Sequence, residues 1–116
     1  MSSAPYAQGI PCPPASMIAQ SASDLDAFSF NNYGRYYTVW SHSTFEYAGL
    51  NWHVAVDSLY ADPSDQSKAF DAARSIVTSV TANSSMTAWK ESYDRLLCSY
   101  ESPSQAGVFA YVIISD

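Results

Sequence analysis

Basic side chains are scarce in this chain of 116 residues. Five Lys and Arg stand against eleven Asp and Glu, which gives a formal net charge of −6 at pH 7. The five are scattered at positions 35, 68, 74, 90 and 95, so no cluster of them is available to neutralise phosphates. We therefore expect no nucleic-acid partner, and an anionic lipid surface is an equally poor one.

Long hydrophobic runs are also missing. The apolar runs fall far short of the ~20 residues that span a bilayer, so no membrane insertion is expected. Hydrophobic residues nevertheless make up 47% of the chain against 14% charged, which excludes a disordered acidic tail. We predict a single domain over residues 12–116. An extended segment over residues 1–11 precedes it, because Pro5, Gly9 and Pro11 disfavour regular structure there.

Cysteine is limited to Cys12 and Cys98. Neither has another ligand at C-x-x-C or H-x-x-H spacing, so no metal site is predicted. Few Lys, much Ser, Tyr, Thr and Asn, and a Pro-rich start are typical of an exported protein. This composition favours a Cys12–Cys98 disulfide over the alternative of two free buried thiols. Closing a loop of that length would stabilise the fold by roughly 4 kcal/mol.

The chain opens without a signal peptide. The first residues, Met1-Ser2-Ser3-Ala4-Pro5, have neither a positively charged stretch nor an apolar one. We expect this to be the mature form of a secreted or periplasmic protein, with Met1 added for expression.

No catalytic motif is present, and no Ser or Cys lies in a nucleophile elbow. We therefore predict that the protein is not an enzyme, with a small secreted hydrolase as the second alternative. His42 and His53 lie in opposite arms of a predicted hairpin, where they are either plain surface residues or, if the register allows, a metal pair or haem ligands. Asp57 shares a strand face with His53 and is a possible hydrogen-bond partner for it.

Aromatic side chains, by contrast, are abundant: nine Tyr, three Trp and five Phe. Many lie in residues 35–42 and 51–59, which are predicted to form two arms of an antiparallel hairpin. Side chains alternate across a strand, so the first arm places Trp40 opposite Tyr37 and the second places Trp52 opposite His53. We assign both tryptophans to the core because they are the largest apolar side chains, and Tyr37 and His53 to the other face.

Residues 63–82 are predicted to form a long helix, because apolar residues recur there at spacings of three and four. Asp62 is the expected N-cap, with Pro63 at the first helical position. A short helix after Pro13, a first strand over 27–30 and strands over 95–101 and 108–114 complete the prediction. Residues 43–50 and 86–91 are each either a loop or a short strand. The predicted fold is α+β, with an antiparallel sheet of about five strands covered by the long helix and the short N-terminal helix, in the order α-β-β-β-α-β-β.

The aromatic residues around the first hairpin arm exceed what one core layer can absorb, unless they are ordinary sheet packing with hydrated hydroxyl groups. We predict an exported, non-enzymatic binding or interaction module that uses the aromatic hairpin surface to contact a protein or a small hydrophobic ligand. The binding candidates are Tyr36, Tyr37, His42, Tyr47 and His53.

Four features follow one another along the chain: the Cys12-Pro13 opening, an aromatic hairpin with Trp40 and Trp52, a middle helix, and Cys98 in a strand before the last β segment. In this layout the chain resembles a family of small secreted bacterial proteins of unknown function, some of them labelled hemin-binding. The resemblance implies haem as the cofactor of an alternative function. The axial ligand would then be His42, His53 or a hairpin tyrosine.

Overall fold

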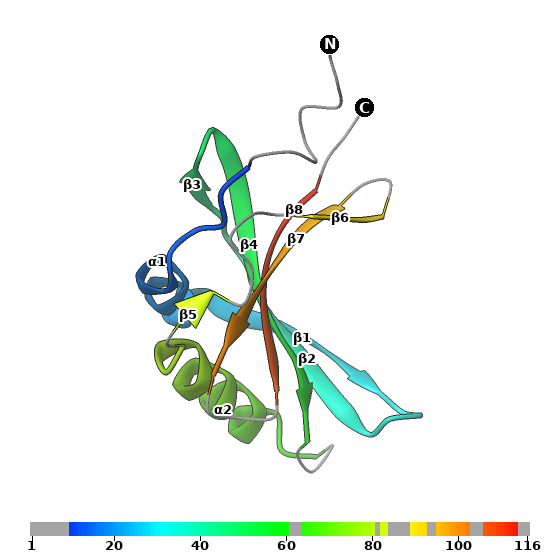
Figure 1. The fold of residues 1–116 in the computed structure, drawn as a ribbon. Coiled ribbons are helices and arrows are strands. Elements are labelled where there is room, and N and C mark those ends of the chain that lie inside the picture. The colour runs from blue at the N-terminus through cyan, green and yellow to red at the C-terminus, as the bar shows by residue number, and fades with distance from the viewer. Residues whose placement is uncertain are drawn as a thin grey trace.

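The fold combines two α-helices with one antiparallel sheet (Figure 1). The computed structural model describes residues 10–60, 64–80, 82–83, 89–92, 95–102 and 106–113, with 82–83 and 89–92 as backbone only. Its elements are α1 (Ala15–Gln20), a 3-10 helix (Ser21–Asp24), β1 (Leu25–Asn31), β2 (Tyr36–Ser41), β3 (Phe45–Tyr47), β4 (Leu50–Leu59), α2 (Gln66–Thr78), β5 (Ala82–Asn83), β6 (Trp89–Ser92), β7 (Arg95–Glu101) and β8 (Gly107–Ile113). The predicted α+β class is confirmed.

The sheet has more strands than the five predicted. Six strands follow one another in the order β1-β2-β4-β8-β7-β5, while β3 pairs with β4 and β6 pairs with β7. Of the two segments left open between loop and strand, residues 43–50 contain β3 and residues 86–91 contain most of β6, which ends at Ser92; the first strand is longer than predicted. The first hairpin contributes β2 and β4, and the last contributes β7 and β8. The two hairpins meet in the middle of the sheet, where β4 pairs with β8 although the two strands are distant in the sequence.

Helix α2 is shorter than the predicted helix over 63–82. Its N-cap is Asp65, whose carboxylate accepts a hydrogen bond from the backbone amide of Lys68; Asp62 and Pro63 lie outside the described residues. At the other end, the hydroxyl groups of Thr78 and Ser79 donate to the backbone carbonyl of Ser75. Such bonds compete with a further helical turn, and the chain enters strand β5 at Ala82 instead.

One face of the sheet is buried. Alternate residues of the four central strands lie on it: Tyr37, Val39, Ser41, Trp52, Val54, Val56, Leu96, Cys98, Tyr100, Val108, Ala110 and Val112. Helix α2 contacts β1, β2 and β4 on this side and contributes the buried residues Ala69, Ala73 and Val77. Figure 1 shows α1 and α2 on the same side of the sheet. The face that neither helix covers is called the open face below.

The predicted faces are right for β4 and wrong for β2. Trp52 is buried and His53 lies on the open face, as expected. Tyr37, however, is only 1% exposed, whereas Trp40 is half-buried on the open face and pairs with Ala55. The cause is the register: Trp40 pairs with Ala55 and Val39 with Val56, so Trp40 shares the face of Ala55 and His53, and side-chain size does not override this pairing.

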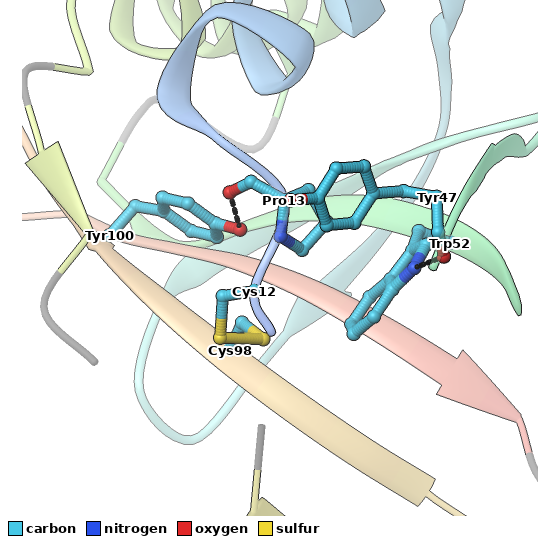
Figure 2. Close-up of a disulfide and its surroundings, with 6 residues drawn as sticks. All are labelled: Cys12, Pro13, Tyr47, Trp52, Cys98 and Tyr100. Atoms are coloured by element: carbon cyan, nitrogen blue, oxygen red, sulfur yellow. Dashed lines mark hydrogen bonds between the residues drawn. A yellow bond between two sulfur atoms is a disulfide. The ribbon is translucent and has the colours of Figure 1, made fainter. Parts of the chain in front are cut away.

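A disulfide between Cys12 and Cys98 ties the start of the chain to β7, as predicted (Figure 2). The Cα atoms of the two cysteines are 5.8 Å apart. Next to them, the buried Tyr100 hydroxyl donates to the carbonyl oxygen of Pro13 at 2.6 Å. Burial raises the pKa of Tyr100 well above its ordinary value, with a smaller contribution from Tyr47, so the phenol remains a donor at neutral pH.

The prediction of an extended segment over residues 1–11 falls mostly outside the described residues, since these begin at Ile10. Among the helices that the structure describes, none combines the length and the apolar character needed to cross a membrane.

The face assignment can be tested by truncation. Tyr37→Ala should lower the free energy of unfolding by about 3–5 kcal/mol, because it removes a fully buried ring that packs against Phe28 and Phe30. Trp40→Ala should cost less than half as much, since part of that ring already faces solvent. Urea unfolding curves of both variants measure the difference. A larger loss for Trp40→Ala would contradict the arrangement.

The disulfide has its own test. Replacing both cysteines by serine should lower the free energy of unfolding by about 2–5 kcal/mol, because the unfolded chain regains the freedom that the bridge removes. Tyr100→Phe is the matched local control, and losing one buried hydrogen bond should cost about 1–3 kcal/mol. Urea unfolding measures both. A non-reduced mass that still includes both thiol hydrogens would contradict the bridge.

Candidate functional site

The sequence-predicted binding residues do not form one surface. Tyr37 is in the core, not on the exposed face where it was expected, so its ring is not available at the surface. The ring of Tyr36 packs edge-on against Tyr60 at 6.0 Å, and Tyr47 packs against the core, with its carbonyl oxygen accepting from the Trp52 indole (Figure 2). His42 remains exposed, 3.9 Å from the carboxylate of Asp26. Of the five candidates, Tyr36 and His53 have strand positions on the open face, but only the position of His53 is next to Tyr111.

A pocket of about 380 Å³ lies on the open face, and it draws on both hairpins. Its lining residues come from β2, β4, β7 and β8 and are Thr38, Trp40, Ala55, Asp57, Arg95, Leu97, Phe109 and Tyr111. The strand register arranges them in rows: Asp57 lies opposite Gly107, Ala55 lies opposite Phe109, and His53 lies opposite Tyr111. The floor is therefore aromatic and apolar, with a carboxylate towards one end and a guanidinium towards the other.

The carboxylate end is shaped by the β-bulge. Tyr37 pairs with Leu59 and Val39 with Val56, so Thr38 alone faces both Asp57 and Ser58. Ser58 has a positive φ of 63°, a conformation that costs a non-glycine residue roughly 1–2 kcal/mol. In return, the Ser58 amide and the Thr38 hydroxyl both donate to Oδ1 of Asp57, at 2.8 and 2.7 Å. These two bonds fix the direction of the carboxylate at the rim of the pocket.

A glycine lets the floor extend to this carboxylate. A Cβ atom on Gly107 would lie 2.8 Å from Cε2 of Phe109, closer than real Cβ contacts allow. The Phe109 ring therefore leans along β8 over the position where a larger residue at 107 would place its side chain. Since Gly107 is opposite Asp57, the ring and the carboxylate are neighbours.

The guanidinium end is a stack of three groups. The His53 and Tyr111 rings stack at 4.9 Å with an interplanar angle of 14°, and Cζ of Arg95 lies 5.1 Å from the Tyr111 ring centroid. Burial, with a further contribution from the Arg95 charge, lowers the pKa of His53 despite the opposing effect of the Ser41 backbone. Burial raises the pKa of Tyr111, although Arg95 opposes this. At neutral pH both rings are therefore uncharged and Arg95 supplies the positive charge.

Metal and haem ligation remain without support from geometry. Within the described ranges, no group of three or more His, Cys, Asp or Glu side chains is placed to hold a metal ion. His42 lies beside Asp26, while His53 stacks on Tyr111 with its Nδ1 buried and without a hydrogen-bond partner among described residues. Asp57 bonds to Thr38 and Ser58 rather than to His53, so the pairing considered from sequence is not formed. Haem binding stays a prediction.

Sequence reasoning missed most of the pocket. Arg95, Leu97, Phe109 and Tyr111 alternate regularly with buried residues of β7 and β8, which was the signal available for a second two-sided hairpin. The missing information was that β8 lies beside β4. Without that pairing, nothing joins the last hairpin to Trp40 and Asp57.

The lowered pKa of His53 predicts a pH dependence of stability. The unfolded chain binds a proton on this residue from about pH 6.5 downwards, before the folded protein does. The free energy of unfolding is therefore highest, as far as His53 is concerned, above pH 6.5. It decreases as the pH falls from 6.5 towards the folded-state pKa of His53. His53→Phe keeps the stack and should flatten the pH profile of urea unfolding in this window. Equal slopes in wild type and His53→Phe would contradict the pKa direction.

Comparisons of the chain with models of known protein families, with curated proteins and with solved structures found no significant match. Function must therefore be argued from the open-face pocket itself.

Proposed function

We propose that this protein is a non-enzymatic binding module whose open-face pocket takes a small hydrophobic ligand. The observation that carries the proposal is that Trp40 of β2 and Phe109 and Tyr111 of β8 line one concave site of about 380 Å³. This volume is within the range of small-molecule sites, which are mostly apolar with a few oriented polar groups. The proposed contact surface therefore differs from the one predicted from the sequence: it includes the open faces of both hairpins and not of the first hairpin alone.

Rigidity supports the same proposal. All eight lining residues belong to strands of one sheet, and the Cys12–Cys98 disulfide lies beneath it on the buried face. A site built on paired strands keeps its shape in the absence of ligand, so little conformational entropy is lost on binding. The polar groups at the rim are fixed by the hydrogen bonds of Asp57 and by the contact of Arg95 with Tyr111.

We also propose that the protein works outside the cytoplasm, in a secreted or periplasmic setting. The supporting observation is the disulfide, because such bonds form and persist in oxidising compartments.

Ligand binding is tested with N-phenyl-1-naphthylamine, a neutral aromatic probe that fluoresces when it leaves water. Wild type should bind it with saturable fluorescence. Ala55→Trp should reduce the affinity at least about tenfold, since an indole placed on the pocket floor occupies the space that the probe needs.

The matched control is Ala72→Trp, the same change at an exposed position of α2 on the other side of the sheet. It should leave the titration unchanged. Thermal melts of both variants identify any loss of fold. Folded Ala55→Trp protein with wild-type affinity would overturn the proposed site, as would wild type that gives no saturable signal.

A further inference from the structure

Asp57 places a carboxylate in the lining of the open-face pocket, and its two oxygen atoms are used differently. Oδ1 accepts from the Thr38 hydroxyl at 2.7 Å and from the Ser58 amide at 2.8 Å. Within the residues that the structure describes, Oδ2 accepts no hydrogen bond and Asp57 forms no ion pair. A carboxylate accepts at both oxygens, so Oδ2 can still accept from a donor on a ligand.

Aromatic rings line the same pocket. Trp40 and Phe109 belong to its lining together with Asp57, and both rings offer an apolar surface to the body of a ligand. The face of such a ring also attracts a positive charge. The formal net charge of −6 for the whole chain favours the approach of a cation over that of an anion. The pocket therefore suits a ligand that is aromatic and positively charged.

The positive charge in the lining lies in a different row of the sheet. Cζ of Arg95 is 5.1 Å from the Tyr111 ring centroid, and Tyr111 pairs with His53. Asp57 pairs with Gly107, and these two pairs are the first and the last between β4 and β8. A cation at Asp57 is therefore separated along the strands from the ring that Arg95 contacts.

From these observations we infer that the pocket takes an aromatic ring system that carries a protonated amine on a short alkyl arm. The ammonium group donates to Oδ2 of Asp57, and the rings lie against Trp40 and Phe109. An ammonium group supplies a donor and a charge opposite to that of the carboxylate, which together make a strong hydrogen bond. A bare divalent cation fits less well, because it takes several oxygen ligands, and no three acidic, His or Cys side chains are grouped for this within the described ranges. The inference rests on the proposed function, since it specifies the ligand of the same pocket.

The test compares two probes of one shape: 2-naphthylmethylamine, which is protonated at neutral pH, and the uncharged 2-naphthylmethanol. Each is titrated into wild-type protein loaded with N-phenyl-1-naphthylamine, and the loss of fluorescence on displacement gives its affinity. The amine should bind about tenfold more tightly than the alcohol, because it makes a charge-assisted hydrogen bond. This comparison needs no variant, so it tests the charge of the ligand on the unaltered fold.

Asp57→Asn tests the carboxylate itself. The amide oxygen of asparagine can keep the bonds from Thr38 and Ser58, while its NH₂ group replaces Oδ2 and cannot accept from an ammonium group. The variant should bind the amine about tenfold more weakly and keep its affinity for the alcohol within about twofold. The matched control is Asp71→Asn, which removes the same charge from an exposed position of α2 on the other side of the sheet. It should change neither affinity.

Equal affinities of the wild type for the amine and the alcohol overturn the inferred ligand class and leave the hydrophobic pocket intact. The same holds if Asp57→Asn keeps full affinity for the amine or weakens both probes equally. An Asp71→Asn effect of the same size also overturns the inference, because the amine then responds to the net charge of the protein. Failure of both probes to displace N-phenyl-1-naphthylamine overturns the ligand class, whereas failure of N-phenyl-1-naphthylamine itself to bind overturns the proposed function.

Discussion

The covalent link between Cys12 and Cys98 is the constraint on which the two-sided sheet depends. Helix α2 packs over β1, β2 and β4, and the segment at Cys12 and Pro13 supplies buried cover over β7. The hydrogen bond from Tyr100 to Pro13 holds that segment at a second point (Figure 2). With one face closed by these two covers, alternation along every strand sends the remaining side chains to the open face. The pocket is thus a consequence of how the opposite face is sealed.

The division of the aromatic residues follows from the same alternation. Tyr37, Trp52 and Tyr100 fill the buried layer, whereas Trp40, Phe109 and Tyr111 lie opposite them on the open face. A single core layer has no room for both sets, because interiors are already close-packed. The high aromatic content therefore reports two surfaces, one structural and one accessible. The sequence argument recognised the surplus but considered the first hairpin alone, whereas Phe109 and Tyr111 of the open face come from the last hairpin.

How far the sequence predicts this structure depends on the range of the interactions involved. The faces of β4, the disulfide and the presence of α2 follow from local alternation, composition and helical spacing. The faces of β2 do not, because both of its alternating sets contain aromatic side chains and only the pairing of Trp40 with Ala55 decides which set is buried. The pocket is even harder to predict from the sequence, since it requires the pairing of β4 with β8, which are neighbours in space and distant in the chain. No local pattern states which strands pair.

The bulge between β2 and β4 favours the proposed binding role over a purely structural one. A regular ladder between β2 and β4 would give Thr38 one partner and would avoid the positive φ of Ser58. The observed pairing instead adds one residue to β4 and directs two donors at a single oxygen of Asp57. Burial explains neither the strain nor the direction, because Asp57 is only half-buried. Under the proposed function, a carboxylate fixed at the rim of an apolar floor would set the orientation of a ligand more than its affinity, since the floor would supply most of the buried area.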